Sequence, residues 1–432
     1  MIQFERFTLS NGLKVLVHED PHTAYVVVNV LYNVGARDED PEKTGFAHLF
    51  EHLMFGGSKH IPDYDQEVQR AGGENNAFTN NDITNYYIKL PAVNVETALW
   101  LESDRMLELD FSEKNLDVQR KVVCEEFKEH YLNKPYGDVW QILREMAYQV
   151  HPYRWMTIGK ELAHIEQARL EDVKAFFYKH YRPNHAILVV AGGIRCQEVK
   201  PLIEKWFGDI PAGAPYHRQL PQEPEQRAKR TRTVCKDVPA DALYMAFPMC
   251  ARLDEAYYAT ELLAQILGEG ESSRLHQQLV KEKKYFSQIH AYVLESADPG
   301  LLVIEGKLLQ GITPEQAEKA IWDVVQEVQA NKIPEQELQK AKNKLESLFA
   351  FEETSLLGRA INLAFFEWLG KAEWINEQMH RFEAVSTDAV QQLAQQLFQE
   401  QKANVLYYLS QAMHPSCTAA QHTDHPVAQP QQ

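Results

Sequence analysis

The stretch Phe46-Ala47-His48-Leu49-Phe50-Glu51-His52-Leu53-Met54-Phe55 sets two histidines and a glutamate among apolar residues. A helix is predicted over residues 41–55. Residues four apart on a helix share one face, so His48 and His52 can present two imidazoles to one ion. Glu51 sits beside that face, where its carboxylate could take a proton from a metal-bound water. Imidazole and carboxylate groups in so apolar a helix need partners, and a metal supplies them.

A hydrolytic zinc site uses three protein ligands and keeps one position open for water. The third ligand therefore has to come from another element, and the best local candidate is a predicted helix that contains residues 119–126. Neighbouring residues on a helix diverge by about 100°, so adjacent acids cannot both face one ion. Periodicity alone leaves Glu125, Glu126 and Glu129 as alternatives.

The composition describes a folded, acidic chain. Its 432 residues suggest two or three domains at roughly 150 residues each, and 44% apolar with 10% aromatic residues exclude intrinsic disorder. A formal charge of −17 disfavours nucleic acid or an anionic membrane as the main partner. The acidic balance fits a basic or neutral ligand better.

The N-terminus shows no basic stretch followed by an apolar run, so no secretory signal is visible, and no apolar segment approaches the ~20 residues of a membrane helix. The cysteines are scattered, odd in number and form no CxxC pair, which predicts no disulfide framework and a cytoplasmic location. A periplasmic location stays open for a chain trimmed of its signal. The five are Cys124, Cys196, Cys235, Cys250 and Cys417.

The chain divides into two halves of similar order. The first opens with a predicted hairpin, residues 4–9 and 13–17, around Asn11-Gly12. Residues 208–230 are rich in proline and poor in apolar side chains, which predicts a linker, and the order of strands and helices then restarts. We therefore predict a metal-bearing unit at 1–210, a linker at 211–230, a second unit at 231–412 and a flexible tail at 413–432.

HxxEH is the inverted zincin signature. Residues 48–52, followed by Met54-Phe55-Gly56-Gly57-Ser58, resemble the pitrilysin and mitochondrial-processing-peptidase family of zinc peptidases. The resemblance covers almost the whole chain. Its further landmarks are Gly73-Glu74-Asn75-Asn76-Ala77-Phe78-Thr79, Thr84-Asn85-Tyr86-Tyr87, Arg120 to Glu126, His151-Pro152-Tyr153, Tyr181-Arg182-Pro183-Asn184 and Ser272-Ser273-Arg274-Leu275.

The resemblance implies an α+β fold of two homologous units that face each other across a cavity, each a mixed or antiparallel sheet covered on one face by helices. It implies Zn²⁺ as the metal, with Glu126 as the third ligand beside His48 and His52, and Glu51 as the general base. It also implies an edge strand that takes the peptide as an added β-strand, with Asn76, Ala77 and Thr79 as substrate-binding residues.

The implied activity is that of a zinc metalloendopeptidase acting on extended peptides or unfolded segments. The alternative is a non-catalytic peptide-binding or scaffold subunit of the same fold. Such a protein has no need to keep His48, Glu51, His52 and Glu126 together. A third interpretation makes Cys124 a redox or nucleophilic residue, but a buried apolar position on the ligand helix explains it better.

Two departures from the family pattern stand out. Gln119 occupies a position, seven residues before the third ligand, where the family often has a glutamate. In the second half, many relatives place an Arg and, seven residues later, a Tyr that grip the substrate carbonyl, and the aligned positions here are Val280 and Ser287. Lys281 and Tyr285 lie nearby but fit poorly in register and spacing. We therefore predict a dimer with a homologous, zinc-less partner subunit that supplies the Arg/Tyr pair.

Overall fold

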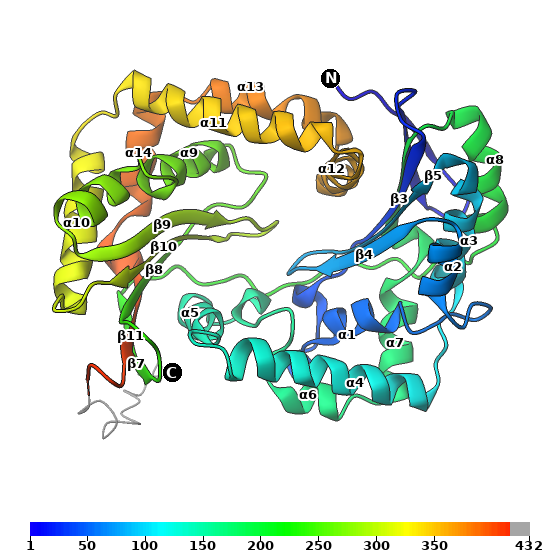
Figure 1. Cartoon of the computed structure of the whole chain (residues 1–432), viewed down its shortest axis with the longest axis horizontal. Helices are drawn as coiled ribbons and strands as arrows, with labels where there is room; N and C mark the ends of the chain where they lie inside the picture. The colour runs from blue at the N-terminus through cyan, green and yellow to red at the C-terminus, as the bar shows by residue number, and fades with distance from the viewer. Residues whose placement is uncertain (415–432) are drawn as a thin grey trace.

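Two β-sheets stand on opposite sides of the molecule (Figure 1). The structure is a computed structural model and describes residues 1–414, so the predicted tail at 413–432 lies almost entirely outside the described residues. The strands are β1 (Glu5–Thr8), β2 (Lys14–Glu19), β3 (Tyr25–Tyr32), β4 (Glu74–Thr79), β5 (Thr84–Pro91), β6 (Ala186–Gly192), β7 (Arg230–Lys236), β8 (Ala242–Pro248), β9 (Phe286–Leu294), β10 (Leu301–Leu308) and β11 (Asn404–Ser410).

The two sheets repeat one topology. The first sheet has the order β1-β2-β6-β3-β5-β4, and the second has the order β7-β11-β8-β10-β9. In the first sheet β6 lies parallel to β2, and in the second sheet β11 lies parallel to β7. The strands that follow in each order, starting with β3 beside β6 and β8 beside β11, pair with their neighbours in antiparallel fashion. The predicted α+β fold of two units with mixed sheets is therefore confirmed, and β1 is an addition to the first half.

The predicted N-terminal hairpin is present, with β1 antiparallel to β2. Gly12 takes a φ of +88° in its turn, where a side chain would also collide with Asn184, so glycine fits this position. The central strand β3 has no polar/apolar alternation because both of its faces are covered. Val26, Val28 and Val30 belong to one core, and Val27 and Leu31 to another.

Each sheet carries helices of its own half on one face, as predicted. In the first half α1, α3, α7 and α8 pack there, and in the second half α9, α10, α11 and α14 do so. The helices are α1 (Phe46–Leu53), α2 (Tyr64–Arg70), α3 (Val95–Leu107), α4 (Glu113–Phe127), α5 (Val139–Ala147), α6 (Leu162–Glu166), α7 (Leu170–His180), α8 (Cys196–Phe207), α9 (Ala256–Gly268), α10 (Pro314–Ala330), α11 (Glu335–Thr354), α12 (Leu356–Leu369), α13 (Gln378–Glu383) and α14 (Thr387–Leu397).

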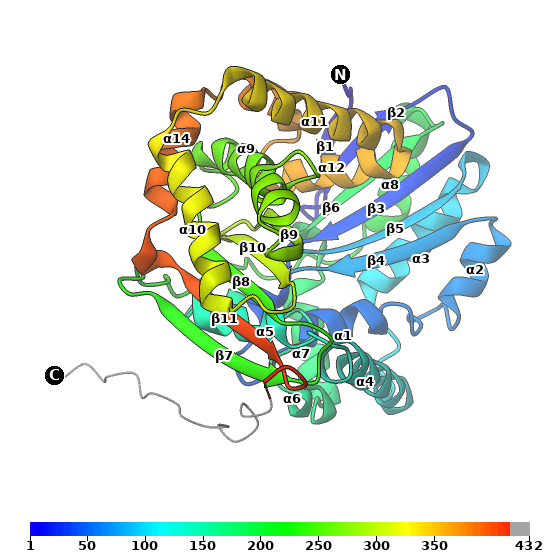
Figure 2. The same cartoon turned by 60° about the vertical axis from the view of Figure 1, so that its left-hand side comes forward.

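The other face of each sheet is covered by a helix of the opposite half, which the sequence did not predict. Helix α12 of the second half lies on β3 and β6, where Ala360, Leu363 and Ala364 join the core (Figure 2). Helix α5 of the first half lies on β8 and β11, where Ile142 and Leu143 are buried. The two halves thus exchange helices.

The chain between α8 and β7 has no regular secondary structure, in agreement with the composition of the predicted linker. The unit boundaries at 1–210, 211–230 and 231–412 stay a prediction. Among the described residues, no helix is long and apolar enough to cross a bilayer.

The loop between β9 and β10 joins the halves through a partly buried ion-pair cluster. Arg37 Nη1 lies 2.7 Å from Asp298 Oδ2 and 3.0 Å from Asp82 Oδ1, and His151 lies 3.4 Å from Asp298. Burial acts to raise the pKa of Asp298, but the hydrogen bond from His151 and the charge of Arg37 outweigh it and lower the pKa to about 2.

This shift predicts how the junction responds to acid. Because the pKa of Asp298 is lower in the folded chain than its ordinary 3.8, its contribution is present above pH ~4 and is lost as the pH falls towards 2. We expect Asp298→Asn to lower the free energy of unfolding by about 1 kcal/mol at pH 7, since partial exposure screens the pairs. Urea unfolding should show the same difference at pH 5 and a smaller one at pH 3. Asp209→Asn, at an exposed position, is the control, and a difference independent of pH would contradict the role of the charge.

Candidate metal centre

The helix that carries the HxxEH motif is amphipathic. On α1, Phe46, Leu49 and Phe50 are buried, and the Phe50 ring stacks on Phe176 of α7 with ring centroids 5.1 Å apart. His48, Glu51 and His52 occupy the opposite, partly exposed face. The apolar face therefore fixes the helix on the core and leaves the polar face free for chemistry.

Helix α1 begins at Phe46, five residues later than predicted. Gly45 precedes it with a φ of +88°, and a Cβ there would lie 2.6 Å from the Ile158 carbonyl oxygen. Only glycine fits such a position. The sequence prediction, which started the helix at residue 41, overlooked this turn.

A buried carboxylate caps α1. Glu39 accepts hydrogen bonds from the N–H of Gly45 (2.9 Å) and of Ala47 (2.8 Å), and from the indole N–H of Trp155 (3.1 Å). Burial raises the pKa of Glu39 to about 8, although the three hydrogen-bond donors act to lower it. Glu39 is therefore mostly the neutral acid at pH 7, and its cap consists of hydrogen bonds. Sequence reasoning missed Glu39 because the predicted helix started beyond it.

The structure brings His48, His52 and Glu126 together. Nε2 of His48 lies 3.6 Å, and Nε2 of His52 3.3 Å, from the same Glu126 oxygen, and one ligand atom from each residue lies within 4.8 Å of the others. Ligands at about 2.0–2.2 Å from a tetrahedral zinc stand roughly 3.3–3.6 Å apart. The donor set and its spacing fit zinc.

Helix α4 presents Glu126 and turns the alternative acids away. Glu125 is exposed and forms an ion pair with Lys128 at 2.8 Å, and Glu129 is exposed. The helix widens into the π-helix η3 (Lys128–Leu132) two residues after Glu126, a distortion often found at functional sites. Tertiary packing thus selects among the three acids that periodicity left open. Cys124 is buried with a raised pKa, caused first by burial, so a nucleophilic thiolate is disfavoured.

The protonation states suit a metal centre. Burial, and then the neighbouring His52, lower the pKa of His48 to about 4, which keeps its imidazole neutral at pH 7. Neutral imidazole is the ligand form of histidine. Nδ1 of His48 is buried without a hydrogen-bond partner.

Glu51 lies between the histidines and strand β4. Burial raises its pKa, and the nearby Thr79 and His52 lower it again in part. The Thr79 hydroxyl, although it lies against the carboxylate, makes no hydrogen bond of standard geometry. A carboxylate with a pKa shifted towards neutrality is suited to proton transfer.

Strand β4 is the edge of the first sheet, as predicted for Asn76, Ala77 and Thr79. The N–H of Ala77 donates to the side-chain oxygen of Asn76 (2.8 Å) instead of to β5. An outward N–H on an edge strand is the donor that an added strand would use. The structure therefore provides an open edge beside Glu51.

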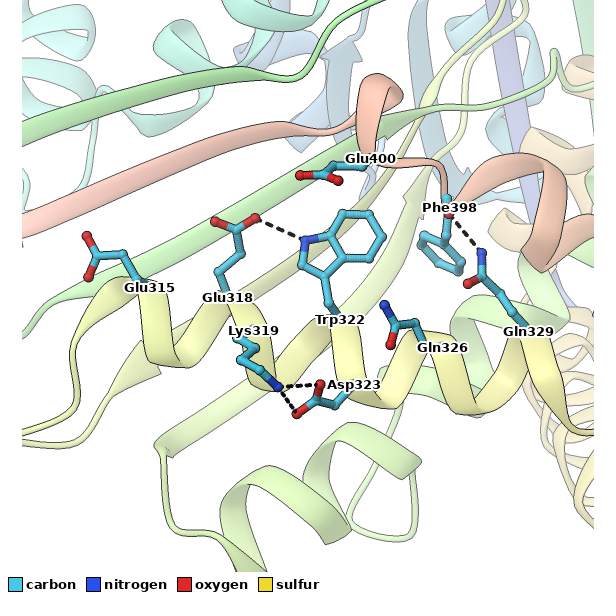
Figure 3. Close-up of a pocket in the computed structure, with 9 residues that line it drawn as sticks. All are labelled: Glu315, Glu318, Lys319, Trp322, Asp323, Gln326, Gln329, Phe398 and Glu400. Carbon is cyan, nitrogen blue, oxygen red and sulfur yellow. Dashed lines mark hydrogen bonds and ion pairs between the residues drawn. The ribbon is translucent and has the colours of Figure 1, made fainter.

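A cavity of about 540 Å³ lies elsewhere, on α10 of the second half (Figure 3). Its buried carboxylate, Glu318, accepts a hydrogen bond from Trp322 (3.0 Å) and pairs with Lys229 (2.5 Å). Asp323 pairs with Lys319 at 2.9 Å. Because these groups already satisfy one another, this cavity offers no hydrolytic machinery.

An HxxEH helix facing a carboxylate on a second helix, in a frame of two repeated mixed sheets, defines an inverted-motif metallopeptidase architecture. The family model described as Insulinase (Peptidase family M16) matches residues 14–160, and that described as Peptidase M16 inactive domain matches residues 167–345. The chain belongs to peptidase family M16.

Individual relatives agree with this assignment. The chain is 32% identical to the zinc protease PqqE of Helicobacter pylori over 78% of this chain and 77% of that protein. A solved protease structure from Helicobacter pylori has a TM-score of 0.88 at 29% identity, and the match covers 94% of this chain and all of the other. The periplasmic protease PqqL from Escherichia coli shares the fold at 19% identity with a TM-score of 0.77, and the match covers 96% of this chain but 48% of PqqL.

The Glu39 cap gives a test of what positions the motif helix. Glutamine keeps the size of the side chain but replaces one acceptor oxygen by a donor, which leaves a buried N–H unsatisfied. We expect Glu39→Gln to lower the free energy of unfolding by about 1–3 kcal/mol, measured by urea unfolding. The neighbouring Glu42 is exposed, so Glu42→Gln should change stability by less than about 0.5 kcal/mol. Equal effects of the two substitutions would contradict the capping role.

Proposed function

We propose that this chain is a zinc metalloendopeptidase that hydrolyses extended peptides or unfolded segments, and that it is the catalytic subunit of a two-chain assembly. The observation that carries the proposal is the convergence of His48, His52 and Glu126, with Glu51 on the same helix face. Relatives named zinc proteases support the choice of metal.

The residues divide the chemistry among them. His48 and His52 would hold the zinc from α1, and Glu126 would hold it from α4. When bound, zinc supplies a Lewis acid for the scissile carbonyl and lowers the pKa of water. Glu51 takes the proton of the attacking water and delivers it to the leaving amine.

Strand β4 would orient the substrate. A peptide added to its open edge gains main-chain hydrogen bonds that do not depend on side-chain identity. Ala77 and Thr79 lie on this edge, and Thr79 lies next to Glu51. The Asn76 side chain would have to release the Ala77 N–H. An extended conformation is required for this pairing, which favours peptides and unfolded segments over folded proteins.

The competing function is a non-catalytic peptide-binding or scaffold subunit. The family model described as inactive matches residues 167–345, whereas the metal ligands and Glu51 lie within the other matched region. A scaffold gains nothing from three converging ligands and an adjacent acid, because burying unpaired polar groups costs stability. The complete set therefore favours the enzyme.

Three matched variants test the assignment. Glu51→Gln should retain about one zinc per chain by metal analysis while peptide hydrolysis falls by about 10²–10⁴-fold. Glu126→Gln should lose zinc together with activity. Glu125→Gln, one residue away on the exposed face, should keep both. Retained hydrolysis in Glu51→Gln would overturn the role of the base, and retained zinc in Glu126→Gln would overturn the ligand set.

The second half of this chain offers no Arg/Tyr pair at the expected positions. Val280 packs against the apolar core, and the Ser287 hydroxyl donates to the Lys307 carbonyl (3.2 Å). Of the two nearby candidates, Lys281 faces Glu271 at 4.0 Å and Tyr285 packs on the core. PqqL contains in one chain about twice the length that this chain matches, so a second subunit of similar fold is a reasonable complement.

The proposal of a partner subunit predicts that peptide hydrolysis depends on the presence of that subunit. The purified zinc-loaded chain alone should cleave peptides at least ~10²-fold more slowly than the assembly co-purified from the native source, since loss of one carbonyl-stabilising donor has about that effect. An assembly rebuilt with Glu51→Gln should stay inactive, which shows that the partner adds no catalytic site of its own. A normal rate for the isolated chain would contradict the two-chain assembly.

The cytoplasmic location stays a prediction.

A further inference from the structure

A cavity of about 300 Å³ lies where the two halves meet beside the metal centre. Its walls include Thr79, Asn81, Arg144 and Tyr153 from the first half and Val293 and Ser296 from the second. Thr79 is the residue that lies against the Glu51 carboxylate. The cavity therefore opens next to the proposed general base, along the direction in which β4 leads.

Arg144, on α5, brings to this cavity a positive charge that has no ion-pair partner among the described residues. Nη1 donates to the side-chain oxygen of Asn81 (3.0 Å) and to the carbonyl of Tyr153 (3.3 Å), both neutral acceptors. Nε is buried and has no hydrogen-bond partner. Among the described residues, no carboxylate lies within ion-pair distance of Arg144.

The acids in the cavity wall are committed to other partners. Asp82 pairs with Arg37 at 3.0 Å and accepts hydrogen bonds from the Tyr153 hydroxyl (2.5 Å) and the Ala297 N–H (2.9 Å). Glu295 is paired with Arg252. Asp82 attracts Arg144 only from beyond ion-pair distance, and burial lowers the pKa of Arg144 in spite of it. A guanidinium without a direct ion-pair partner in a partly buried site is costly.

Tyr131 places Arg144 near the metal ligands. Its ring packs on Phe127 at the end of α4, with centroids 5.6 Å apart. Burial raises the pKa of Tyr131, and the charges of Arg144 and Glu126 shift it in opposite directions, so both groups lie near its hydroxyl. A ligand at Arg144 would thus lie on the same wall of the interior as the metal centre, within the reach of one bound peptide.

We propose that this cavity binds a carboxylate of the substrate and that Arg144 is a specificity-determining residue. The carboxylate is either an acidic side chain near the scissile bond or the C-terminal carboxylate of a short peptide. Planar guanidinium groups recognise carboxylates through charge-assisted, often bidentate hydrogen bonds. The inference rests on the proposed peptidase function, and it opposes the preference for basic ligands that the net charge of −17 suggests.

The test uses the active assembly and a fluorogenic peptide that it cleaves. Glu and Gln are compared at each of the two positions on either side of the scissile bond, and each peptide is made with a free and an amidated C-terminus. The wild-type enzyme should show a kcat/KM roughly 10- to 100-fold higher for one Glu peptide over its Gln twin, or for the free over the amidated form. The first result identifies a side chain as the source of the carboxylate, and the second identifies the terminus.

Variants then assign the preference to Arg144. Arg144→Gln should abolish the preference for the carboxylate-bearing peptide, while kcat/KM for the neutral peptide changes much less. Arg144→Lys keeps a positive charge and should retain part of the preference. Asn81→Asp leaves Arg144 intact but supplies an internal carboxylate at its Nη1, so it should also abolish the preference. Arg154→Gln, outside the cavity wall, should leave the preference unchanged. Thermal unfolding and zinc content identify any variant that merely misfolds.

Binding separates this proposal from the peptidase function. The affinity of the same peptides for Glu51→Gln, measured by fluorescence anisotropy, does not require hydrolysis. A carboxylate preference in binding that disappears in Glu51→Gln/Asn81→Asp supports the site even if the wild type hydrolyses nothing. Equal binding and equal cleavage of all peptide pairs, or a preference that survives Arg144→Gln and Asn81→Asp, would overturn the proposal.

Discussion

The two sheets of this protein each have two apolar faces, and the helices of one half cover only one of them. The remaining face is covered by a helix from the opposite half, α12 on the first sheet and α5 on the second. Exposing such a face would leave a large patch of apolar surface in water. Burial of these second sheet faces therefore holds the two halves together. It also fixes the position of each half relative to the other.

The geometry of the candidate metal centre depends on this exchange of helices. Helix α4, which carries Glu126, continues through the π-helix η3 towards α5, and α5 is docked on the second sheet. The cap of α1 is tied to the same region, since Trp155 donates to Glu39. His151 and Tyr153, from the same segment, contact Asp298 in the loop between β9 and β10. The positions of His48, His52 and Glu126 thus depend on how the second half sits against the first.

Local sequence signals predicted the elements that carry the chemistry. The spacing of His48, Glu51 and His52 predicted a shared helix face, and Asn11-Gly12 predicted the first hairpin, because both depend on short-range geometry. The third ligand was different: periodicity left three acids open, and the resemblance to a family chose Glu126. In the structure, the packing of α4 on α1 brings Glu126 to His48 and His52. The role of Glu39 and the missing countercharge of Arg144 depend on residues far away in the chain, so no local pattern could reveal them.

The repeat of one topology in both halves allows the helix of the candidate site, α1, to be compared with its counterpart in the second half. In the second sheet α9 follows β8 as α1 follows β3, but α9 is buried over most of its length. Such a helix stabilises the core through apolar area alone. A helix with His48, Glu51 and His52 on one face gives up part of that area and requires a cap, a second helix with a carboxylate and an open edge strand nearby. The second half has no such helix to support. It contributes α12, the loop around Asp298 and one wall of the cavity beside Arg144.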